Sequence, residues 1–217
     1  MHARGQSREP GNPGSWMRAT DDEIREKYLD RAIREINALG HEIQDCELCP
    51  RGNLMPVMGS GHPQADVMFL KYAPQPSEIE EGVAFYGRSG TALMKSLKRL
   101  GIDPLVVYGT LFVKCPVRDT DQSAAECRAR VAAEIAIVQP RMVVVMGELA
   151  VAELNALTLP LGREVAAAVG EVQALTPSID ALYVPDIDAA LDEEGAKRRF
   201  WEAFRALGRW YDELPPY

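Results

Sequence analysis

The sequence RMVVVMG, residues 141–147, determines the expected fold class. Its centre is continuously apolar, which is typical of a strand buried on both faces of a parallel sheet. Pro140 stops the helical pattern that precedes it, and that helix is predicted to start with a capping box at Ser123. A short helix is predicted to follow Gly147, up to about Leu157. A helix, a buried strand and another helix in this order indicate an α/β fold.

The same alternation continues in both directions along the chain. Further strands are predicted at residues 65–70, 104–115, 171–175 and 181–184, and further helices at residues 20–40, 93–100 and 189–207. We therefore predict one three-layer α/β/α domain over residues 20–210, with a mostly parallel central sheet. Residues 1–19 are predicted to be a disordered tail, and residues 211–217 a short tail.

The composition limits the function classes. The 217 residues are 47% hydrophobic, as in a globular protein. The formal net charge of −8 argues against a broadly basic surface for nucleic acid, although a local basic patch is compatible with it. No apolar run approaches the roughly 20 residues that cross a bilayer, and residues 1–19 lack a secretory signal. We expect a cytoplasmic protein that has no membrane partner.

The chain has four cysteines in two separated pairs. Cys46 and Cys49 form a C-x2-C motif, and Cys115 and Cys127 follow as a wider pair. In a cytoplasmic chain this pattern fits a metal or cluster site better than disulfides. The spacing leaves open a structural zinc ion, a [4Fe–4S] cluster or buried free thiols. It favours the cluster modestly, because the second pair comes from separate predicted elements.

The segment LKYAPQPSEIEEGVAFYGRSG, residues 70–90, leaves the carboxyl end of the first predicted long strand. Ligands of open α/β sheets bind at these ends, so the segment is a predicted pocket loop. Its glutamates, Glu78, Glu80 and Glu81, are expected to lie on a solvated loop, because runs of exposed charge are common. The alternative is that one of them, or Asp186 or Asp188, positions a water molecule.

Several motifs occur in a characteristic order over residues 43–157. They are CELC, ADVMFL, GVAFYGRSG, VYGTLFVKC and IVQPRMVVVMGELA. Together they resemble the iron–sulfur uracil-DNA glycosylases of the family 4 type. The resemblance implies the uracil-DNA glycosylase fold and a structural [4Fe–4S] cluster held by Cys46, Cys49, Cys115 and Cys127. Zinc stays the alternative that the cysteine spacing leaves open.

The resemblance also implies a pocket for a flipped base. Its residues would be Ala73, Pro74, Gln75, Phe85 and Leu111. Phe85 matches the aromatic residue that stacks on the base, and core packing is the alternative role for it. Leu111 stands where the family has the asparagine that reads the uracil edge.

The catalytic motifs depart from the family pattern. Tyr72 replaces the carboxylate that positions the attacking water, and Asp186 takes the place of the histidine that stabilises the departing uracil anion. An aspartate has the wrong charge for that task. Tyr72 and Asp186 are nevertheless the catalytic candidates. Lys71 replaces a glycine and would either meet an anion or block the base pocket.

The resemblance extends to the start of the next helix. Arg88, Ser89 and Gly90 are the candidates for contacts with a DNA phosphate. Two functions stay open. The first is a DNA glycosylase with altered specificity. The second is a non-catalytic [4Fe–4S] module of the same fold, which would bind nucleic acid or a protein partner. An enzyme of another class that uses the same cleft is a third, weaker idea.

Overall fold

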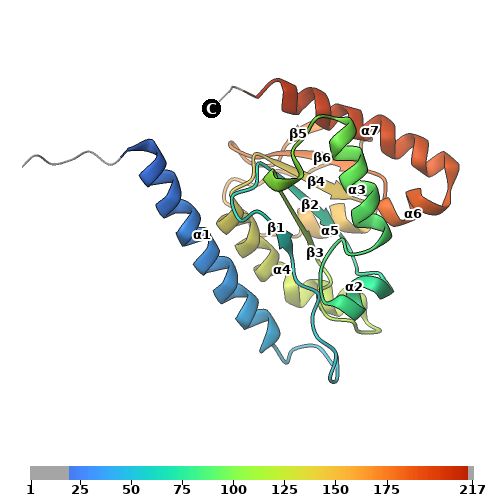
Figure 1. Ribbon diagram of the computed structural model, residues 1–217. Helices are drawn as coiled ribbons and strands as arrows, with labels where there is room; N and C mark the ends of the chain where they lie inside the picture. Colours follow the sequence, from blue (N-terminus) through green and yellow to red (C-terminus); the bar gives the residue numbers. More distant parts are fainter. Residues whose placement is uncertain (1–19, 215–217) are drawn as a thin grey trace, which may run out of the picture.

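The computed structural model describes residues 20–214. The predicted tail at residues 1–19, and residues 215–217 of the predicted C-terminal tail, lie outside the described residues. Within the described part, a six-stranded sheet has the strand order β1-β3-β2-β4-β6-β5 (Figure 1). Its strands are β1 (Ser60–Gly61), β2 (Val67–Lys71), β3 (Val107–Leu111), β4 (Met142–Met146), β5 (Val172–Ala174) and β6 (Asp180–Val184).

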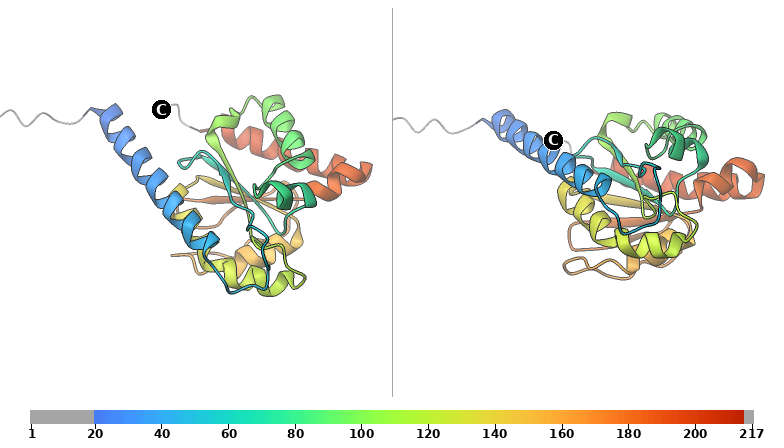
Figure 2. Two further views of the ribbon diagram at one scale, coloured as in Figure 1. Left: turned by 60° about the horizontal axis from the view of Figure 1, so that its bottom comes forward. Right: turned by 90° about the horizontal axis from the view of Figure 1, so that it is seen from below.

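The four central strands are parallel, and the two short edge strands are antiparallel to their neighbours. The helices are α1 (Asp21–Gln44), α2 (Pro76–Glu81), α3 (Arg88–Arg99), α4 (Thr120–Val138), α5 (Glu148–Asn155), α6 (Ile187–Asp192) and α7 (Glu194–Asp212). Helices α3, α6 and α7 pack on one face of the sheet, whereas α4 and α5 pack on the other. Helix α1 lies along α4 on the outside (Figure 2). The predicted α/β class is confirmed.

Strand β4 is the centre of the core, as its apolar sequence predicts. All five of its residues are buried. Met142, Val144 and Met146 belong to the cluster under α3, α6 and α7, while Val143 and Val145 belong to the cluster under α4 and α5. Side chains of a strand alternate between the two faces, so only a continuous apolar run can fill both.

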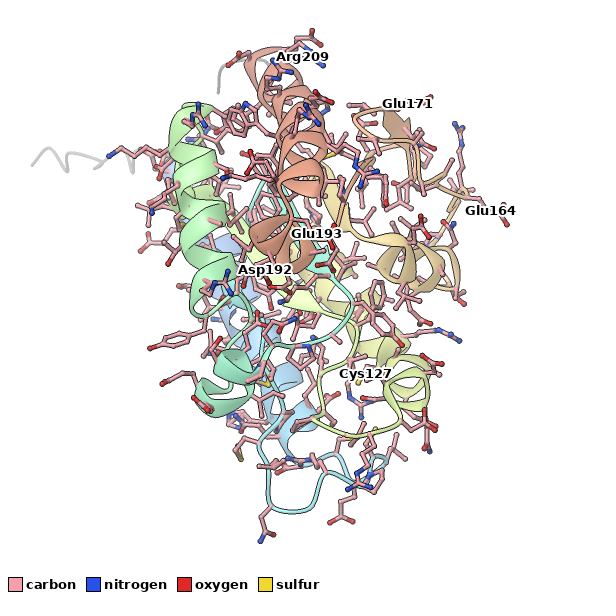
Figure 3. The ribbon with its side chains drawn as sticks, turned by 90° about the vertical axis from the view of Figure 1, so that its right-hand side faces the viewer. Cys127, Glu164, Glu171, Asp192, Glu193 and Arg209 are labelled. Atoms are coloured by element: carbon pink, nitrogen blue, oxygen red, sulfur yellow. The ribbon has the colours of Figure 1, made fainter. Side chains whose placement is uncertain are left out.

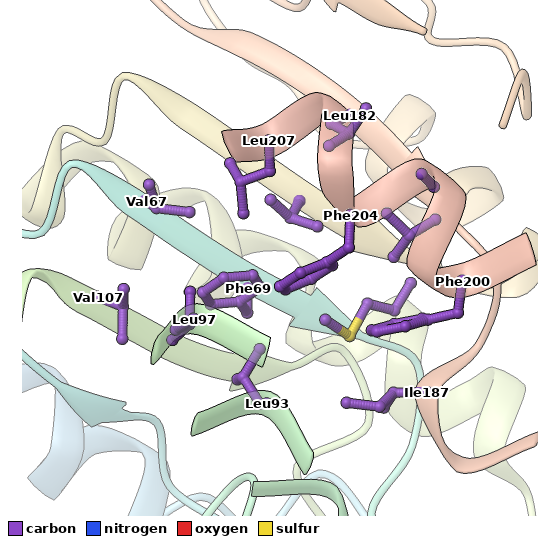
Figure 4. Packing of buried hydrophobic residues seen from close by; sticks show 14 of the residues in the cluster. Val67, Phe69, Leu93, Leu97, Val107, Leu182, Ile187, Phe200, Phe204 and Leu207 are labelled. Atoms are coloured by element: carbon purple, nitrogen blue, oxygen red, sulfur yellow. The ribbon is translucent and has the colours of Figure 1, made fainter. Parts of the chain in front are cut away.

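Three phenylalanines organise the first of these clusters (Figure 4). The rings of Phe69 and Phe204 stack at 5.9 Å between centroids, and those of Phe200 and Phe204 stack at 5.0 Å. Stacked aromatic pairs add roughly 0.5–1.5 kcal/mol beyond their buried area. They attach α7 to β2, the strand that leads into the candidate site.

Several predicted boundaries are wrong for local reasons. Helix α1 continues past Gly40 to Gln44, because an isolated glycine costs a helix only about 1 kcal/mol. Helix α4 begins before Ser123, since the Asp119 side chain accepts a hydrogen bond from the Gln122 N–H at 3.0 Å and caps it. The extended backbone of Glu193 divides the predicted last helix into α6 and α7.

The predicted strand at residues 104–115 is also shorter in the structure. A 3-10 helix, Pro104–Val106, precedes it, and β3 ends at Leu111. Proline favours the start of a helical turn, where its missing N–H is not needed. Within residues 20–214, no helix combines the length and apolarity that crossing a membrane requires.

Candidate functional site

The segment after β2 was predicted to be a pocket loop, and the structure corrects this in part, because the segment contains the short helix α2. Pro76 occupies the first turn of α2, where its missing N–H costs nothing. The Glu78 carboxylate accepts a hydrogen bond from the Gln75 N–H at 2.7 Å, which stabilises the helix start. Gly82 ends the helix with φ 70°, a left-handed conformation that suits glycine.

The glutamates of this segment behave differently from one another. Glu80 and Glu81 are exposed, as predicted for a solvated loop. Glu78 is fully buried, so the prediction is wrong for this residue. The reason is a buried cation: Lys71, the last residue of β2, is also fully buried, and its Nζ lies 2.7 Å from Glu78 Oε2. Buried charges of this kind need a partner, because desolvation disfavours them when alone.

Lys71 also contacts a second carboxylate. Its Nζ lies 2.8 Å from Oδ2 of Asp188, whose side chain is 17% exposed. The triad Lys71–Glu78–Asp188 therefore joins the end of β2, helix α2 and helix α6. With one ammonium and two carboxylates, its formal charge is −1. Sequence spacing did not predict this triad, although a lysine that ends an apolar strand was a usable signal.

Phe85 lies directly against the triad. The Lys71 Nζ is 5.5 Å from the centroid of its ring, within range of a cation–π contact. Phe85 is 8% exposed, and Leu111 is fully buried in the same core cluster. The Phe85 backbone has φ 59°, which a bulky residue rarely adopts, and its N–H donates to Glu78 Oε1 at 2.5 Å. The structure thus places Phe85 in the core with the Lys71 ammonium at its ring.

A cavity of about 570 Å³ lies beside the triad. It opens at the carboxyl ends of β2, β4 and β6, the edge at which α/β sheets bind ligands. Its volume is within the range of small-molecule sites. Of the predicted site residues, Tyr72, Ala73, Gln75 and Asp186 line it, together with Asp188. Pro74, Phe85 and Leu111 are not part of this lining.

Asp186 has a structural task at the cavity wall. Its Oδ1 accepts hydrogen bonds from the N–H groups of Asp188, at 2.8 Å, and Ala189, at 3.0 Å, and so caps α6. Gly147, at the end of β4, approaches it closely. A Cβ at that position would lie 3.3 Å from Asp186 Oδ2, and the φ of 90° already favours glycine. Both residues line the cavity, just beyond the paired ends of β4 and β6.

The cavity is acidic. Its charged lining residues are Glu148, Asp186, Asp188, Glu193 and Arg199. Four carboxylates and one guanidinium give the lining a formal charge of −3. Glu148 and Arg199 were not predicted as site residues, although Glu148 follows a predicted strand end directly and could have been found by that position.

Two tyrosines also line the cavity, Tyr72 and Tyr183. Burial raises the pKa of both phenols, and the charge of Glu148 further raises the pKa of Tyr183. The Tyr72 hydroxyl donates a hydrogen bond to Asp121 Oδ1 at 2.5 Å, on the first turn of α4. The Tyr72 hydroxyl is thus held by the Asp121 carboxylate, and Tyr72 does not take over the role of the carboxylate that it replaces.

The predicted phosphate contacts lie at the start of α3. Arg88 is exposed and pairs at 2.7 Å with Asp192. Asp192 lies near the junction of α6 and α7 (Figure 3). Ser89 and Gly90 are buried. A Cβ at Gly90 would lie 1.7 Å from the Phe85 carbonyl oxygen, so glycine is required there. Of the three residues, the structure places only Arg88 where a phosphate could reach its side chain.

The four cysteines come from three elements. Cys46 and Cys49 follow α1, Cys115 lies beyond β3, and Cys127 is on α4. All four are free thiols, and every one except Cys46 is buried. Burial, followed by the nearby Cys49 and Cys127, raises the pKa of the Cys115 thiol to about 12. Three of the four sulfurs therefore lie close to one another.

The donor set fits a thiolate-bound centre in its chemistry. Four reduced cysteines suit both iron–sulfur clusters and zinc. Within residues 20–214, however, no three His, Cys, Asp or Glu side chains are arranged to hold a metal ion. The Arg51 side chain orders the loop of the first pair, because it donates to the carbonyl oxygens of Cys46 and Leu54.

A second buried ion pair adjoins the cysteines. The Nζ of Lys114 lies 2.9 Å from Glu134 Oε2 and donates to Thr110 Oγ1 at 2.7 Å. The Tyr108 hydroxyl donates to Glu134 at 3.2 Å. This network links β3 to α4 next to Cys115. Glu134 stands beside apolar positions of α4, which is the sequence signal that could have revealed it.

Comparison with known proteins gives a consistent family assignment. Residues 58–207 match the model of the family described as "Uracil DNA glycosylase superfamily". The chain is 31% identical over 121 residues to a protein named Type-4 uracil-DNA glycosylase from Sulfurisphaera tokodaii, covering 52% of this chain and 54% of that protein. A protein of the same name from Pyrobaculum aerophilum is 32% identical over 121 residues, covering 52% and 61%.

A third relative, a Type-4 uracil-DNA glycosylase from Thermotoga maritima, is 30% identical over 128 residues, covering 55% of this chain and 65% of that protein. The chain thus spans between about half and two thirds of the length of these relatives.

Proposed function

Because the chain belongs to the uracil DNA glycosylase superfamily and is of its family 4 type, we propose that it is a DNA glycosylase whose base specificity differs from that for uracil. The observation that carries the proposal is the cavity at the carboxyl ends of β2, β4 and β6, beside the triad Lys71–Glu78–Asp188. The ammonium of Lys71 at the Phe85 ring and the buried Leu111 support the altered specificity.

The reaction would be hydrolysis of the N-glycosidic bond. A water oxygen bonds to C1′ of the sugar while the bond from C1′ to the base nitrogen breaks, and its electron pair leaves with the base. The water proton passes to a carboxylate. Asp188 is our candidate for that carboxylate, because it lines the cavity and its Oδ2 is held by Lys71 at 2.8 Å.

We further propose that Cys46, Cys49, Cys115 and Cys127 hold a [4Fe–4S] cluster, with zinc as the alternative. Its contribution would be structural, because it would cross-link the loop after α1, the segment after β3 and helix α4. Purified protein is expected to be brown and to contain iron and sulfide. Colourless protein with one zinc ion per chain would exclude the cluster.

The non-catalytic alternative has one observation in its favour. Phe85 and Leu111, two of the residues predicted for the base pocket, are buried in the core. In that case the chain would keep the fold and the cluster but bind nucleic acid or a protein without cleavage.

The test is base release from defined DNA. Single- and double-stranded oligonucleotides carrying uracil, hypoxanthine or an alkylated purine would be incubated with cluster-loaded protein, and free base would be measured by chromatography. We expect release of a base other than uracil, and loss of that release in Asp188→Asn. The matched control is Asp30→Asn, which alters an exposed aspartate of α1 outside the cavity lining. Failure to release any base, with the cluster present, would reject the glycosylase and favour the alternative.

A further inference from the structure

The charge of the cavity restricts what it can bind. Its lining carries a formal charge of −3, and adding the buried pair Lys71 and Glu78 behind Asp188 leaves this total unchanged. Arg199 is the one cation among the lining residues, and its charge acts on Tyr183 together with the opposite charges of Glu148 and Asp186. Such a field repels an anion and attracts a cation, more strongly where water is partly excluded.

Tyr183 gives an independent sign that a ligand belongs in this cavity. The residue is 6% exposed and lines the cavity, and its hydroxyl makes no hydrogen bond within residues 20–214. The buried side-chain atoms without a partner among the described residues do not include this oxygen, so the hydroxyl opens to the cavity and is free to donate to or accept from a bound molecule. Tyr72 also lines the cavity, and aromatic rings attract cations.

The chemistry of the leaving group points the same way. Uracil leaves as an anion and is stabilised by positive charge, but Asp186 stands where the family has a histidine, and the lining sets four carboxylates against one guanidinium. A purine alkylated on N3 or N7 carries a positive charge before cleavage. When its bond to C1′ breaks, the electron pair neutralises the ring, and the base departs uncharged. Water supplies the new oxygen at C1′, and its proton goes to a carboxylate.

We propose that the cavity takes a cationic, N-alkylated purine base, with Tyr183 and the carboxylates Glu148 and Glu193 as its recognition residues. The inference rests on the proposed glycosylase function. It names the substrate class of that same site.

The experiment compares DNA containing 7-methylguanine with otherwise identical DNA containing uracil. We expect the methylated base to be released at least about tenfold faster at low salt, with the preference falling as salt screens the field. Glu193→Gln should lower release of the methylated base about two- to fivefold. Glu164→Gln, an exposed glutamate outside the lining, should change nothing (Figure 3).

A second measurement tests recognition without turnover. In mildly acidic buffer, 7-methylguanosine is cationic while guanosine is neutral. Titration calorimetry should show that the protein binds 7-methylguanosine more tightly than guanosine. The Tyr183→Ala variant should bind 7-methylguanosine more weakly. Release of uracil at an equal or higher rate than the methylated base would overturn the inference and leave the glycosylase function standing. Release of no base would overturn both, and equal binding of the two nucleosides would overturn the assignment of the cavity.

Discussion

Replacing Lys71 by methionine tests the buried triad most directly. The side chain keeps most of its apolar length but loses the ammonium that lies 2.7 Å from Glu78 and 2.8 Å from Asp188. The fully buried Glu78 carboxylate would keep only two hydrogen bonds, from the N–H groups of Gln75 and Phe85. Asp188 is partly exposed and regains some hydration.

The expected loss follows from this geometry. Removing one partner of a buried ion pair costs about 3–5 kcal/mol, because the other charge stays buried and uncompensated. In a chain of this size, 1 kcal/mol corresponds to roughly 2–4 °C in Tm, so the melting temperature should fall by about 6–20 °C. The free energy of unfolding would be measured by urea denaturation, followed by circular dichroism.

Two further variants make the result interpretable. Lys95→Met removes an exposed lysine of α3 and should change stability by less than about 0.5 kcal/mol. The double variant Lys71→Met with Glu78→Gln removes both charges. Its loss of unfolding free energy should be smaller than the sum of the losses in the two single variants, by a coupling energy of about 0.5–3 kcal/mol. If Lys71→Met behaves like Lys95→Met, or if the two changes add, the ammonium is not held between buried carboxylates.

Three other outcomes are expected. Gly90→Ala should lower Tm sharply, because its Cβ would lie 1.7 Å from the Phe85 carbonyl oxygen. The control is Gly195→Ser, which should leave Tm nearly unchanged, because Gly195 is exposed and a Cβ there meets no other atom. Glu134→Gln should lower the free energy of unfolding, measured in urea, by about 3–5 kcal/mol, because Lys114 would stay buried without its carboxylate. A loss below about 1 kcal/mol would contradict a buried ion pair between Lys114 and Glu134. Burial raises the pKa of Tyr108 above its usual 10.0, so the unfolded chain releases this proton first, and stability should fall as the pH rises above about 10. Tyr108→Phe should flatten that alkaline slope in pH-dependent denaturation.

Much of the fold could be predicted because its signals are local. The apolar sequence of β4 requires burial on both faces, and the Thr20 capping box starts α1 as expected. Helix ends were less predictable, because they depend on single competing contacts. The Asp119 cap that starts α4 before Ser123 is one example.

The candidate site likewise has features that the sequence predicts and features that only the tertiary structure gives. The sequence by itself determined five of the six strands, the four-cysteine set and the positions Tyr72 and Asp186, because each depends on residue type and order. Only the tertiary structure decided that Lys71 and Asp188, 117 residues apart, meet at 2.8 Å. The physical reason is that a buried charge must find its partner in space. No spacing along the chain specifies which carboxylate that will be.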